Sequence, residues 1–362
     1  MLYLTNADVQ RVLDMGETLD ALRQGYADLA RGDAVYIPRI DLYAPTGRDD
    51  DYYRWGSMTG YCRSEDVVAC RIKSDVVFWP DGRTEEKYCM QPGTYSGIIL
   101  VYRASNGEPL AIVQDGYLQH MRVGGSAGLG VDVLARKDAA TVGVLGSGGM
   151  ARTYLQAIAA ARPLRSGKVY SPTPEHRERF AAQMSDELHM QLWPVGSAEE
   201  AVRGADIVVT ATDSIVPTFD AAWVSDGAHM TCVTRREMDQ TMLDRADVIV
   251  QLGWQTIKPG ADVPDLEWPR SAMAAYIAGQ PHERARIPRG RAEEQGNYPL
   301  LVDVVAGRQP GRTDDRQVTM FVNTGTQGLQ FAAVAGRAYR LARQADIGQE
   351  LPTAWFLQDI RD

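Results

Sequence analysis

The segment 139–163, AATVGVLGSGGMARTYLQAIAAARP, constrains the fold of this chain more than any other. An apolar run at 142–145 suits a buried parallel strand, a glycine turn follows, and apolar residues then recur at helical spacing. Gly146, Gly148 and Ala151 occupy the positions of a G-x-G-x-x-A pattern. The first glycine allows a tight turn, the second lets a pyrophosphate approach, and the small alanine lets helix and strand pack closely. The segment predicts a dinucleotide site, although a glycine turn without a ligand gives the same short pattern.

The start of the predicted helix would hold the pyrophosphate, because the first N–H groups of a helix have no partners within it. The expected contacts in the turn are Gly146, Ser147, Gly148, Gly149, Met150 and Ala151. Thr212 follows a later predicted strand and would border the nicotinamide, because ligands lie at the carboxyl ends of parallel strands.

Further short apolar runs follow the turn, and segments with helical or turn character separate them. These predicted strands cover residues 168–171, 191–195, 206–210, 229–233 and 247–251. Alternation of strands and helices is typical of a parallel sheet with helices on both faces. The middle of the chain is therefore expected to form an α/β fold, a Rossmann-type doubly wound parallel sheet.

The flanking segments have a different pattern. Residues 36–111 contain Tyr-, Val- and Ile-rich runs separated by turn signals at 80–82 and 105–107, which predict hairpins of a mixed or antiparallel sheet. Near the C-terminus, a strand at 317–323 and a helix at 328–344 are expected to rejoin this first domain. We therefore predict that a Rossmann domain, residues 119–315, is inserted in an α+β substrate and dimerisation domain, residues 1–118 plus 316–362.

Composition limits the class of protein. The 362 residues have a net charge of -9, which argues against nucleic acid as the main partner because phosphate binding needs a basic face. No apolar run approaches the roughly 18 residues of a membrane span, and the charged N-terminal segment does not resemble a signal peptide. The four cysteines lack C-x-x-C spacing, so they indicate neither a metal site nor a disulfide. We expect a cytoplasmic protein without metal or membrane partners.

Short segments in a specific order run through the chain: Ile37-Pro38-Arg39, Arg71-Ile72-Lys73-Ser74, Asn106-Gly107-Glu108-Pro109-Leu110-Ala111, Leu134-Ala135-Arg136, Ala306-Gly307-Arg308 and Pro310-Gly311-Arg312-Thr313. Together with the glycine turn, these segments resemble the ornithine cyclodeaminase and mu-crystallin family of nicotinamide-dependent proteins. The resemblance extends over nearly the whole chain. It implies the two-domain organisation described above and a homodimer.

The resemblance also implies roles for three cations. The family residues that match Arg39, Lys73 and Arg122 gather over the nicotinamide and hold the substrate carboxylate. An arginine fork can grip a carboxylate through two hydrogen bonds, and a lysine can exchange a proton when its surroundings favour the neutral form. The alternative is that Arg39 and Lys73 are charges at strand edges. His120 is a further acid–base candidate, but a packing role is the more common one for such a histidine.

The end of the second predicted strand indicates the cofactor. An acidic residue there would bind the ribose 2′-hydroxyl of NAD, but the chain reads Val-Tyr-Ser-Pro-Thr at 169–173. Ser171, Thr173 and Arg177 suit a 2′-phosphate, so NADP(H) is favoured over NAD(H). The alternative is that Ser171 caps a helix and Arg177 faces water.

Departures from the family limit the reaction. A loop that usually carries an aspartate is shorter here and contains Arg235 and Arg236, while Gln251 and Gln330 stand where aspartates are expected. Cyclodeamination needs several placed acids and bases, whereas a reductase needs one proton donor. The leading hypothesis is an NAD(P)H-dependent oxidoreductase that acts on the C=N or C–N bond of a carboxylate-bearing imino or amino acid. The alternatives are an ornithine or lysine cyclodeaminase with bound NAD, and a non-catalytic NADP-dependent binding protein.

Overall fold

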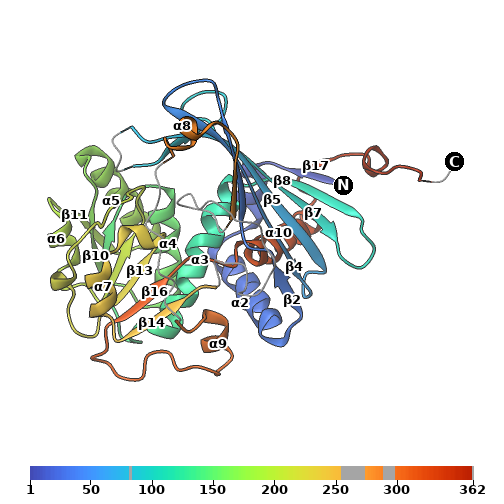
Figure 1. Ribbon diagram of the computed structural model, residues 1–362. Coiled ribbons are helices and arrows are strands. Elements are labelled where there is room, and N and C mark those ends of the chain that lie inside the picture. The colour runs from blue at the N-terminus through green and yellow to red at the C-terminus, as the bar shows by residue number, and fades with distance from the viewer. Residues whose placement is uncertain (81–83, 254–273, 288–297, 361–362) are drawn as a thin grey trace.

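The computed structural model describes residues 1–80, 84–253, 274–287 and 298–360, and two sheets organise these residues (Figure 1). The first is a mixed sheet whose main strands run, from edge to edge, β15 (Ala274–Ile277), β3 (Ile40–Pro45), β4 (Asp51–Cys62), β5 (Val67–Phe78), β7 (Ser96–Arg103), β8 (Pro109–Gln114), β1 (Leu2–Leu4) and β17 (Gln349–Glu350). Two short strands lie off this path, β2 (Ala34–Tyr36) beside β4 and β6 (Glu86–Tyr88) beside β5.

The second sheet has seven strands, and every adjacent pair in it is parallel. Its order is β11 (Gln191–Pro194), β10 (Ser166–Tyr170), β9 (Thr141–Leu145), β12 (Ile207–Thr210), β13 (His229–Cys232), β16 (Thr319–Val322) and β14 (Val248–Gln251). The order turns in opposite directions on either side of β9, as in a doubly wound sheet. The predicted Rossmann-type sheet and the mixed sheet are thus both confirmed.

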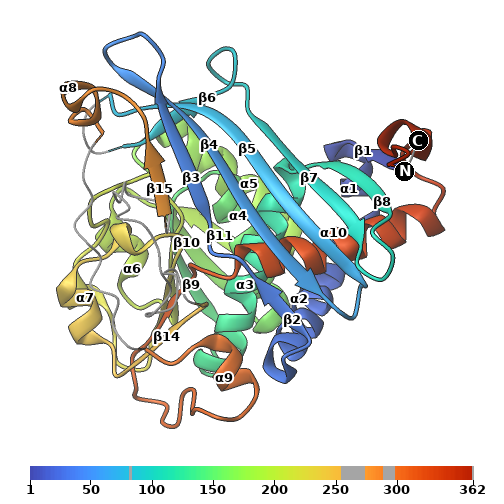
Figure 2. The same ribbon diagram turned by 45° about the vertical axis from the view of Figure 1, so that its right-hand side comes forward.

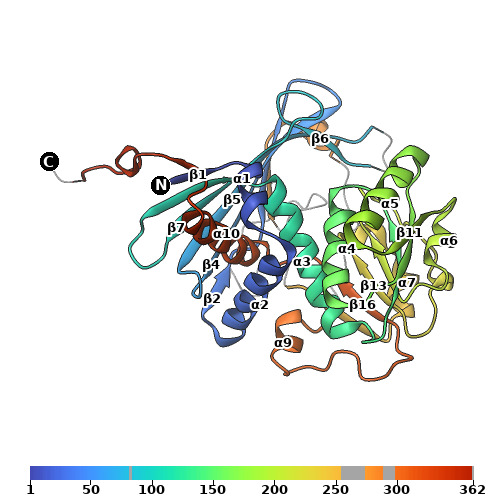
Figure 3. The ribbon, with the colours of Figure 1, turned by 180° about the vertical axis from the view of Figure 1, so that it is seen from behind.

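Helices cover the sheets and join them (Figures 2 and 3). They are α1 (Asn6–Val12), α2 (Met15–Arg31), α3 (Gly116–Leu134), α4 (Gly149–Ala161), α5 (Pro174–Leu188), α6 (Ala198–Val202), α7 (Gln240–Arg245), α8 (Pro281–Arg284), α9 (Leu301–Val305) and α10 (Gln327–Gln344), with 3₁₀ turns η1 (Ala221–Trp223), η2 (Arg235–Glu237) and η3 (Thr353–Phe356). None of the helices in the described ranges combines the length and hydropathy that crossing a bilayer requires.

The expected domain assignment was wrong for two strands. We expected residues 317–323 to rejoin the first domain, but β16 pairs with β13 and β14 inside the parallel sheet. All four residues of β16 are buried, which suits an interior strand of a parallel sheet. In addition, β15 comes from the range 119–315 but pairs with β3 in the mixed sheet. The predicted domain boundaries at 118/119 and 315/316 otherwise stay a prediction.

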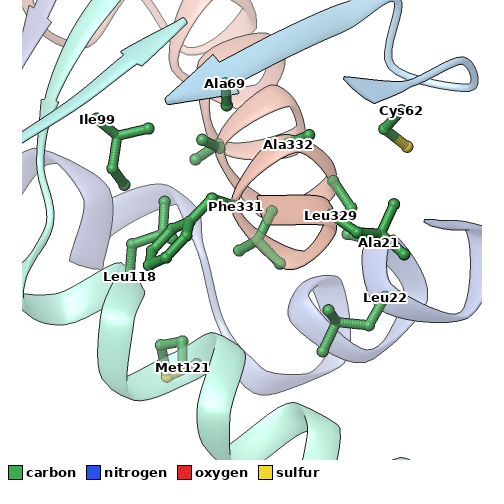
Figure 4. Close-up of a cluster of buried hydrophobic side chains, with 14 of the residues drawn as sticks. Ala21, Leu22, Cys62, Ala69, Ile99, Leu118, Met121, Leu329, Phe331 and Ala332 are labelled. Atoms are coloured by element: carbon green, nitrogen blue, oxygen red, sulfur yellow. The ribbon is translucent and has the colours of Figure 1, made fainter. Parts of the chain in front are cut away.

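The helix at the C-terminus lies on the mixed sheet, as expected. Phe331, Leu329 and Ala332 of α10 pack among buried side chains of α2, α3 and the sheet (Figure 4). The start of α10 touches the backbone of β4, because a Cβ on Gly328 would clash with the carbonyl of Thr59. This close approach needs a glycine at 328, and it fixes the first turn of α10 beside the sheet.

Helix α3 connects the two sheets. Leu118, Met121 and Leu129 belong to the hydrophobic core beneath the mixed sheet, whereas Val123 and Ala127 belong to the core of the parallel sheet. Apolar residues therefore surround this helix, as expected for a helix buried between two layers. Side chains at its start consequently lie between the sheets.

The predicted hairpin turn at 105–107 joins β7 to β8, whereas most of the predicted turn at 80–82 lies outside the described residues.

Candidate active site

The glycine turn has the geometry that a pyrophosphate requires. Gly146 has φ of 113°, a conformation that L side chains rarely adopt, and a Cβ there would clash with the carbonyl of Ala211. Gly148 is the N-cap of α4, and a Cβ on it would meet no atom within 4 Å. No side chain caps α4, so its first N–H groups face this open side. The turn therefore fits a dinucleotide phosphate.

The remaining predicted residues of the turn lie around it. Ala151 is buried and Met150 is half-buried against the core of the parallel sheet. Ser147 and Ser171 form a hydrogen bond between their hydroxyl oxygens at 3.0 Å, which joins the turn to the end of β10. This contact places the two predicted parts of the cofactor site beside each other.

The segment after β10 presents an uncapped helix start. Thr173 is the N-cap of α5, but its side chain makes no capping hydrogen bond. Arg177 donates through Nη1 to the carbonyl oxygen of Ser171 at 2.9 Å, and its guanidinium lies 5.8 Å from the ring centre of Tyr170. Arg177 is thus folded back onto the end of the strand, instead of extending freely into solvent.

A depression of about 120 Å³ lies beside the turn and contains cations that the sequence analysis missed. Its lining residues are Ser147, Gly148, Gly149, Arg152, His176, Arg179, Phe180 and Gln183. The residues at 176 and 179 lie in the first turns of α5, the helix that follows β10. Their short distance in sequence from the end of this strand could have indicated that they lie near the cofactor site.

Thr212 is held by a buried carboxylate at the carboxyl ends of two strands. Both its N–H and its hydroxyl donate to Oε1 of Glu237 at 2.7 Å, and Thr234 N–H donates to Oε2 at 3.1 Å. Burial raises the pKa of Glu237, although these hydrogen bonds favour its charged form. Glu237 therefore ties together the loops that follow β12 and β13, a function that its sequence position alone did not indicate.

Arg39 and Lys73 lie together on the mixed sheet. Arg39 donates from Nε and Nη2 to the two carboxylate oxygens of the buried Asp41, at 2.8 and 2.6 Å. Asp41 and Lys73 flank Gly56 on neighbouring strands, and a Cβ on Gly56 would lie 2.8 Å from Lys73 Cε. Asp41 on β3 and Lys73 on β5 therefore lie in one row, with Gly56 of β4 between them, and Arg39 joins this row through its bond to Asp41.

The surroundings of Lys73 favour its neutral form. Lys73 is buried, and its Nζ lies 3.3 Å from Oδ2 of Asp75. Burial lowers the pKa of Lys73 well below its usual value, and the nearby Arg39 and Arg54 lower it further, against the opposing effect of Asp41 and Asp75. A lysine whose pKa is lowered in this way releases a proton more readily than a lysine in water, so it can take part in proton transfer.

Arg122 is a buried cation whose partners are neutral. It donates from Nη1 to Gln330 Oε1 at 2.7 Å and from Nη2 to Gln119 Oε1 at 2.8 Å, and its guanidinium lies 4.8 Å from the ring centre of Phe331. Among the described residues, no carboxylate forms an ion pair with it. Burial and, less strongly, the charge of Arg71 together lower the pKa of Arg122 to about 9. A buried charge of this kind is stabilised when an anion binds.

Two further side chains lie near Arg122: Arg71, which was not predicted as a site residue, and His120, which the sequence offered as an acid–base candidate. Arg71 lies 5.7 Å from the same Phe331 ring, and its Nε donates to Asp115 at 2.7 Å. His120 lies against the glycine turn, because a Cβ on Gly149 would be 2.9 Å from its Nε2. Burial lowers the pKa of His120, which favours the neutral imidazole. Helix α3 thus brings Arg122 and His120 next to the start of α4. We call Arg39, Arg71, Lys73, His120 and Arg122 the basic cluster.

The loops of the parallel sheet approach the same cluster. Thr84 and Ser214 form an isolated β-bridge between the segment after β5 and the loop after β12. Burial raises the pKa of Glu85, but Arg54 and, more weakly, Arg236 outweigh this effect and bring it to about 2. The site is therefore built from both sheets.

The described residues contain no group of His, Cys, Asp and Glu side chains arranged to hold a metal ion.

Comparison with known proteins agrees with this architecture. The family model for "Ornithine cyclodeaminase/mu-crystallin family" matches residues 2–335. The chain belongs to the ornithine cyclodeaminase/mu-crystallin family. It is 24% identical to an alanine dehydrogenase of Archaeoglobus fulgidus over 356 residues, which cover 97% of this chain and 98% of that protein. Distant relatives thus include an amino-acid dehydrogenase as well as cyclodeaminases.

Two solved structures of family members share the fold. A Δ1-pyrroline-2-carboxylate reductase of Thermococcus litoralis, in complex with NADH and L-proline, has a TM-score of 0.74 and 24% identity, and the match covers 97% of this chain and all of that one. An archaeal alanine dehydrogenase dimer with bound NAD has a TM-score of 0.73 and 21% identity, over 97% of this chain and 99% of that one.

Proposed function

We propose that this protein is an NAD(P)H-dependent oxidoreductase that acts on the C=N or C–N bond of an imino or amino acid, as a ketimine reductase or an amino-acid dehydrogenase. The observation that carries this proposal is that Arg122 is buried with neutral partners while Lys73 is buried with a lowered pKa, and that the charge of Arg39 acts on both. Both lie in the basic cluster next to the glycine turn. Relatives with oxidoreductase activity support the same reaction class.

The chain's own residues have distinct tasks in this proposal. Arg122 binds the substrate carboxylate, since it is the cation of the cluster that lacks a carboxylate partner in the described chain. Lys73 orients the substrate and transfers one proton at its Nζ. Two nitrogens of Arg39 already bind Asp41, so Arg39 has the smaller share in carboxylate binding and helps to lower the pKa of Lys73. When bound, the nicotinamide supplies or accepts the hydride.

We further propose that the cofactor site favours NADP(H). Ser171, Thr173 and Arg177 lie at the end of β10, where NAD-selective sites carry an acid, and no acidic side chain occupies the segment 169–173. The Arg177→Ala variant tests this preference through the dissociation constants of 2′,5′-ADP and 5′-AMP, measured by calorimetry. We expect a loss of at least about tenfold for the first ligand alone. An equal loss for both ligands would reject the preference.

The uncovered face of the mixed sheet supports a homodimer. The helices α2, α3 and α10 all lie on one side of this sheet (Figures 1 and 3). On the other side, outward residues of the strands are apolar and partly or largely exposed, among them Leu42, Trp55, Ile98 and Tyr102. An extended apolar face of this kind marks a protein interface. We propose that a second copy of the chain covers it.

One assay tests the reaction. Purified protein is mixed with NADPH or NADH and a panel of cyclic imino acids, 2-oxo acids with amines, and ornithine, while absorbance of the nicotinamide is followed. The proposal expects cofactor oxidation with an imine. Proline formed from ornithine without net oxidation would instead identify a cyclodeaminase, and ligand binding without either change would identify a non-catalytic binding protein.

A further inference from the structure

Residues near the C-terminus form an apolar arm whose base is bound to the N-terminus and whose large apolar side chains are exposed among the described residues. We call residues 351–360 the C-terminal arm. It begins after β17, at the edge of the mixed sheet, and extends away from both sheets (Figures 1 and 3). Its base is fixed, because Leu351 N–H donates to the carbonyl of Met1 at 2.8 Å and the N-terminal ammonium donates to Thr353 Oγ1 at 2.9 Å. The direction of the arm is thus set by hydrogen bonds at its base.

The side chains of the arm are unusually exposed for their type. Trp355 is 72% exposed, Phe356 44%, Leu357 60% and Ile360 93%. Single exposed apolar residues are common on protein surfaces, but four large ones within six residues form a contiguous patch. Trp and Phe are also enriched among the residues that dominate binding at interfaces.

We infer that the C-terminal arm packs against a second copy of this chain, so that two copies exchange arms. This inference rests on the homodimer proposed above. The arm starts at the edge of the same sheet whose outward face is uncovered, three strands from Ile98 and Tyr102 on β7. The arm consists of the 3₁₀ turn η3 and non-helical residues on either side of it. At about 2 Å per residue in the turn and about 3.3 Å per residue elsewhere, it spans at most roughly 28 Å, which is enough to reach onto a neighbouring subunit.

Two further observations favour a second copy over other occupants. The solved structure of the archaeal alanine dehydrogenase, which matches 97% of this chain, is a dimer. The net charge of this chain is -9, which opposes adsorption of the arm to an anionic membrane surface. An arm that follows an edge strand into a partner adds apolar contact to the interface without altering either sheet.

Photo-cross-linking tests the inference directly. The photoreactive residue p-benzoylphenylalanine replaces Trp355 in the full-length protein, and the purified protein is irradiated and analysed by denaturing electrophoresis and mass spectrometry. We expect covalent dimers, with the cross-link joining position 355 of one chain to the other. Cross-links confined to single chains would overturn the inference, because they would show that the arm folds back onto its own subunit.

A second measurement uses substitutions that leave the core intact. The full-length triple variant Trp355→Ser, Phe356→Ser, Leu357→Ser should raise the dimer dissociation constant by at least about tenfold in sedimentation analysis. The matched control is Trp193→Ser, which removes an exposed tryptophan at the far edge of the parallel sheet and should leave the constant unchanged.

The two proposals fail in different ways. If the full-length protein is monomeric at every concentration, both the homodimer and the arm exchange are wrong. If the protein is dimeric and the triple variant associates as tightly as the parent, only the arm exchange is wrong. Circular dichroism melting of each variant shows whether its fold is retained.

Discussion

Replacing Gln330 with glutamate tests the assignment of Arg122 as the carboxylate ligand. The substitution is nearly isosteric, and it puts a carboxylate oxygen where the amide oxygen now lies 2.7 Å from Arg122 Nη1. The added charge would neutralise the one cation of the cluster that lacks an anionic partner among the described residues. A substrate carboxylate would then have to bind an arginine that is already paired.

The expected size of the effect follows from the burial of this pair. Two unit charges about 4 Å apart interact with about 4 kcal/mol at an effective dielectric constant of about 20. A substrate carboxylate that is not bound also keeps its hydration, and this offsets part of the lost attraction. We therefore expect the binding free energy to weaken by about 2–3 kcal/mol. This loss corresponds to about 30- to 150-fold in KM or in the dissociation constant of a small carboxylate.

The assay is titration of Gln330→Glu and the parent protein with L-proline and pyruvate, by calorimetry in the presence of cofactor, together with thermal melting. The melting temperature should change little, because the buried cation gains a partner while the carbonyl of Gly325 loses the hydrogen bond from Gln330 Nε2. The control is Gln344→Glu, the same exchange at an exposed position of α10. Unchanged carboxylate affinity in a folded Gln330→Glu variant would refute the role of Arg122.

Four other substitutions give separable outcomes. Gly148→Ala should keep the stability of the fold, since a Cβ there meets no atom within 4 Å. It should weaken dinucleotide binding at least about tenfold, as measured by fluorescence titration. Gly146→Ala should instead lower the melting temperature, because the positive φ and the carbonyl of Ala211 leave no room for a side chain. Lys73→Met should reduce kcat by about 10²- to 10⁴-fold while carboxylate binding persists, and equal kcat in the variant would remove Lys73 from the reaction. Burial lowers the pKa of His229 to about 3, so protonation of this histidine favours the unfolded chain. Its contribution to the free energy of unfolding is complete above about pH 6.5. This contribution is lost by about 1.4 kcal/mol per pH unit as the pH falls toward 3. His229→Asn can keep a donor near Thr319 but does not titrate, so its urea unfolding should depend less on pH over this range, and an identical slope would contradict the explanation.

Local patterns predicted much of the cofactor half. The strand, turn and helix around Gly146 follow from glycine conformation and hydrophobic periodicity, and both are properties of adjacent residues. The strands at 191–195, 206–210 and 229–233 were placed within a residue or two of β11, β12 and β13 for the same reason. The strand β16 was found but assigned to the wrong sheet, because strand order depends on contacts between distant segments.

The basic cluster shows where such reasoning stops. The family resemblance pointed to Arg39, Lys73 and Arg122, but no pattern in the chain indicated that Asp41 already holds the first of them. Nor did it indicate that a glutamine 208 residues away is the partner of Arg122. Ion pairs and burial depend on which strands lie next to one another, and pairing across a sheet is not visible in a single strand.

Periodicity, turn chemistry and composition were therefore sufficient for the fold class, the dinucleotide turn and the acidic character of the chain, because each depends on residues close together in the sequence. The tertiary structure alone established which cations are neutralised and which remain unpaired in the described chain, since that outcome depends on burial and on distant carboxylates. It also revealed the exposed arm, because whether Trp355 is covered depends on the position of every other element of the fold.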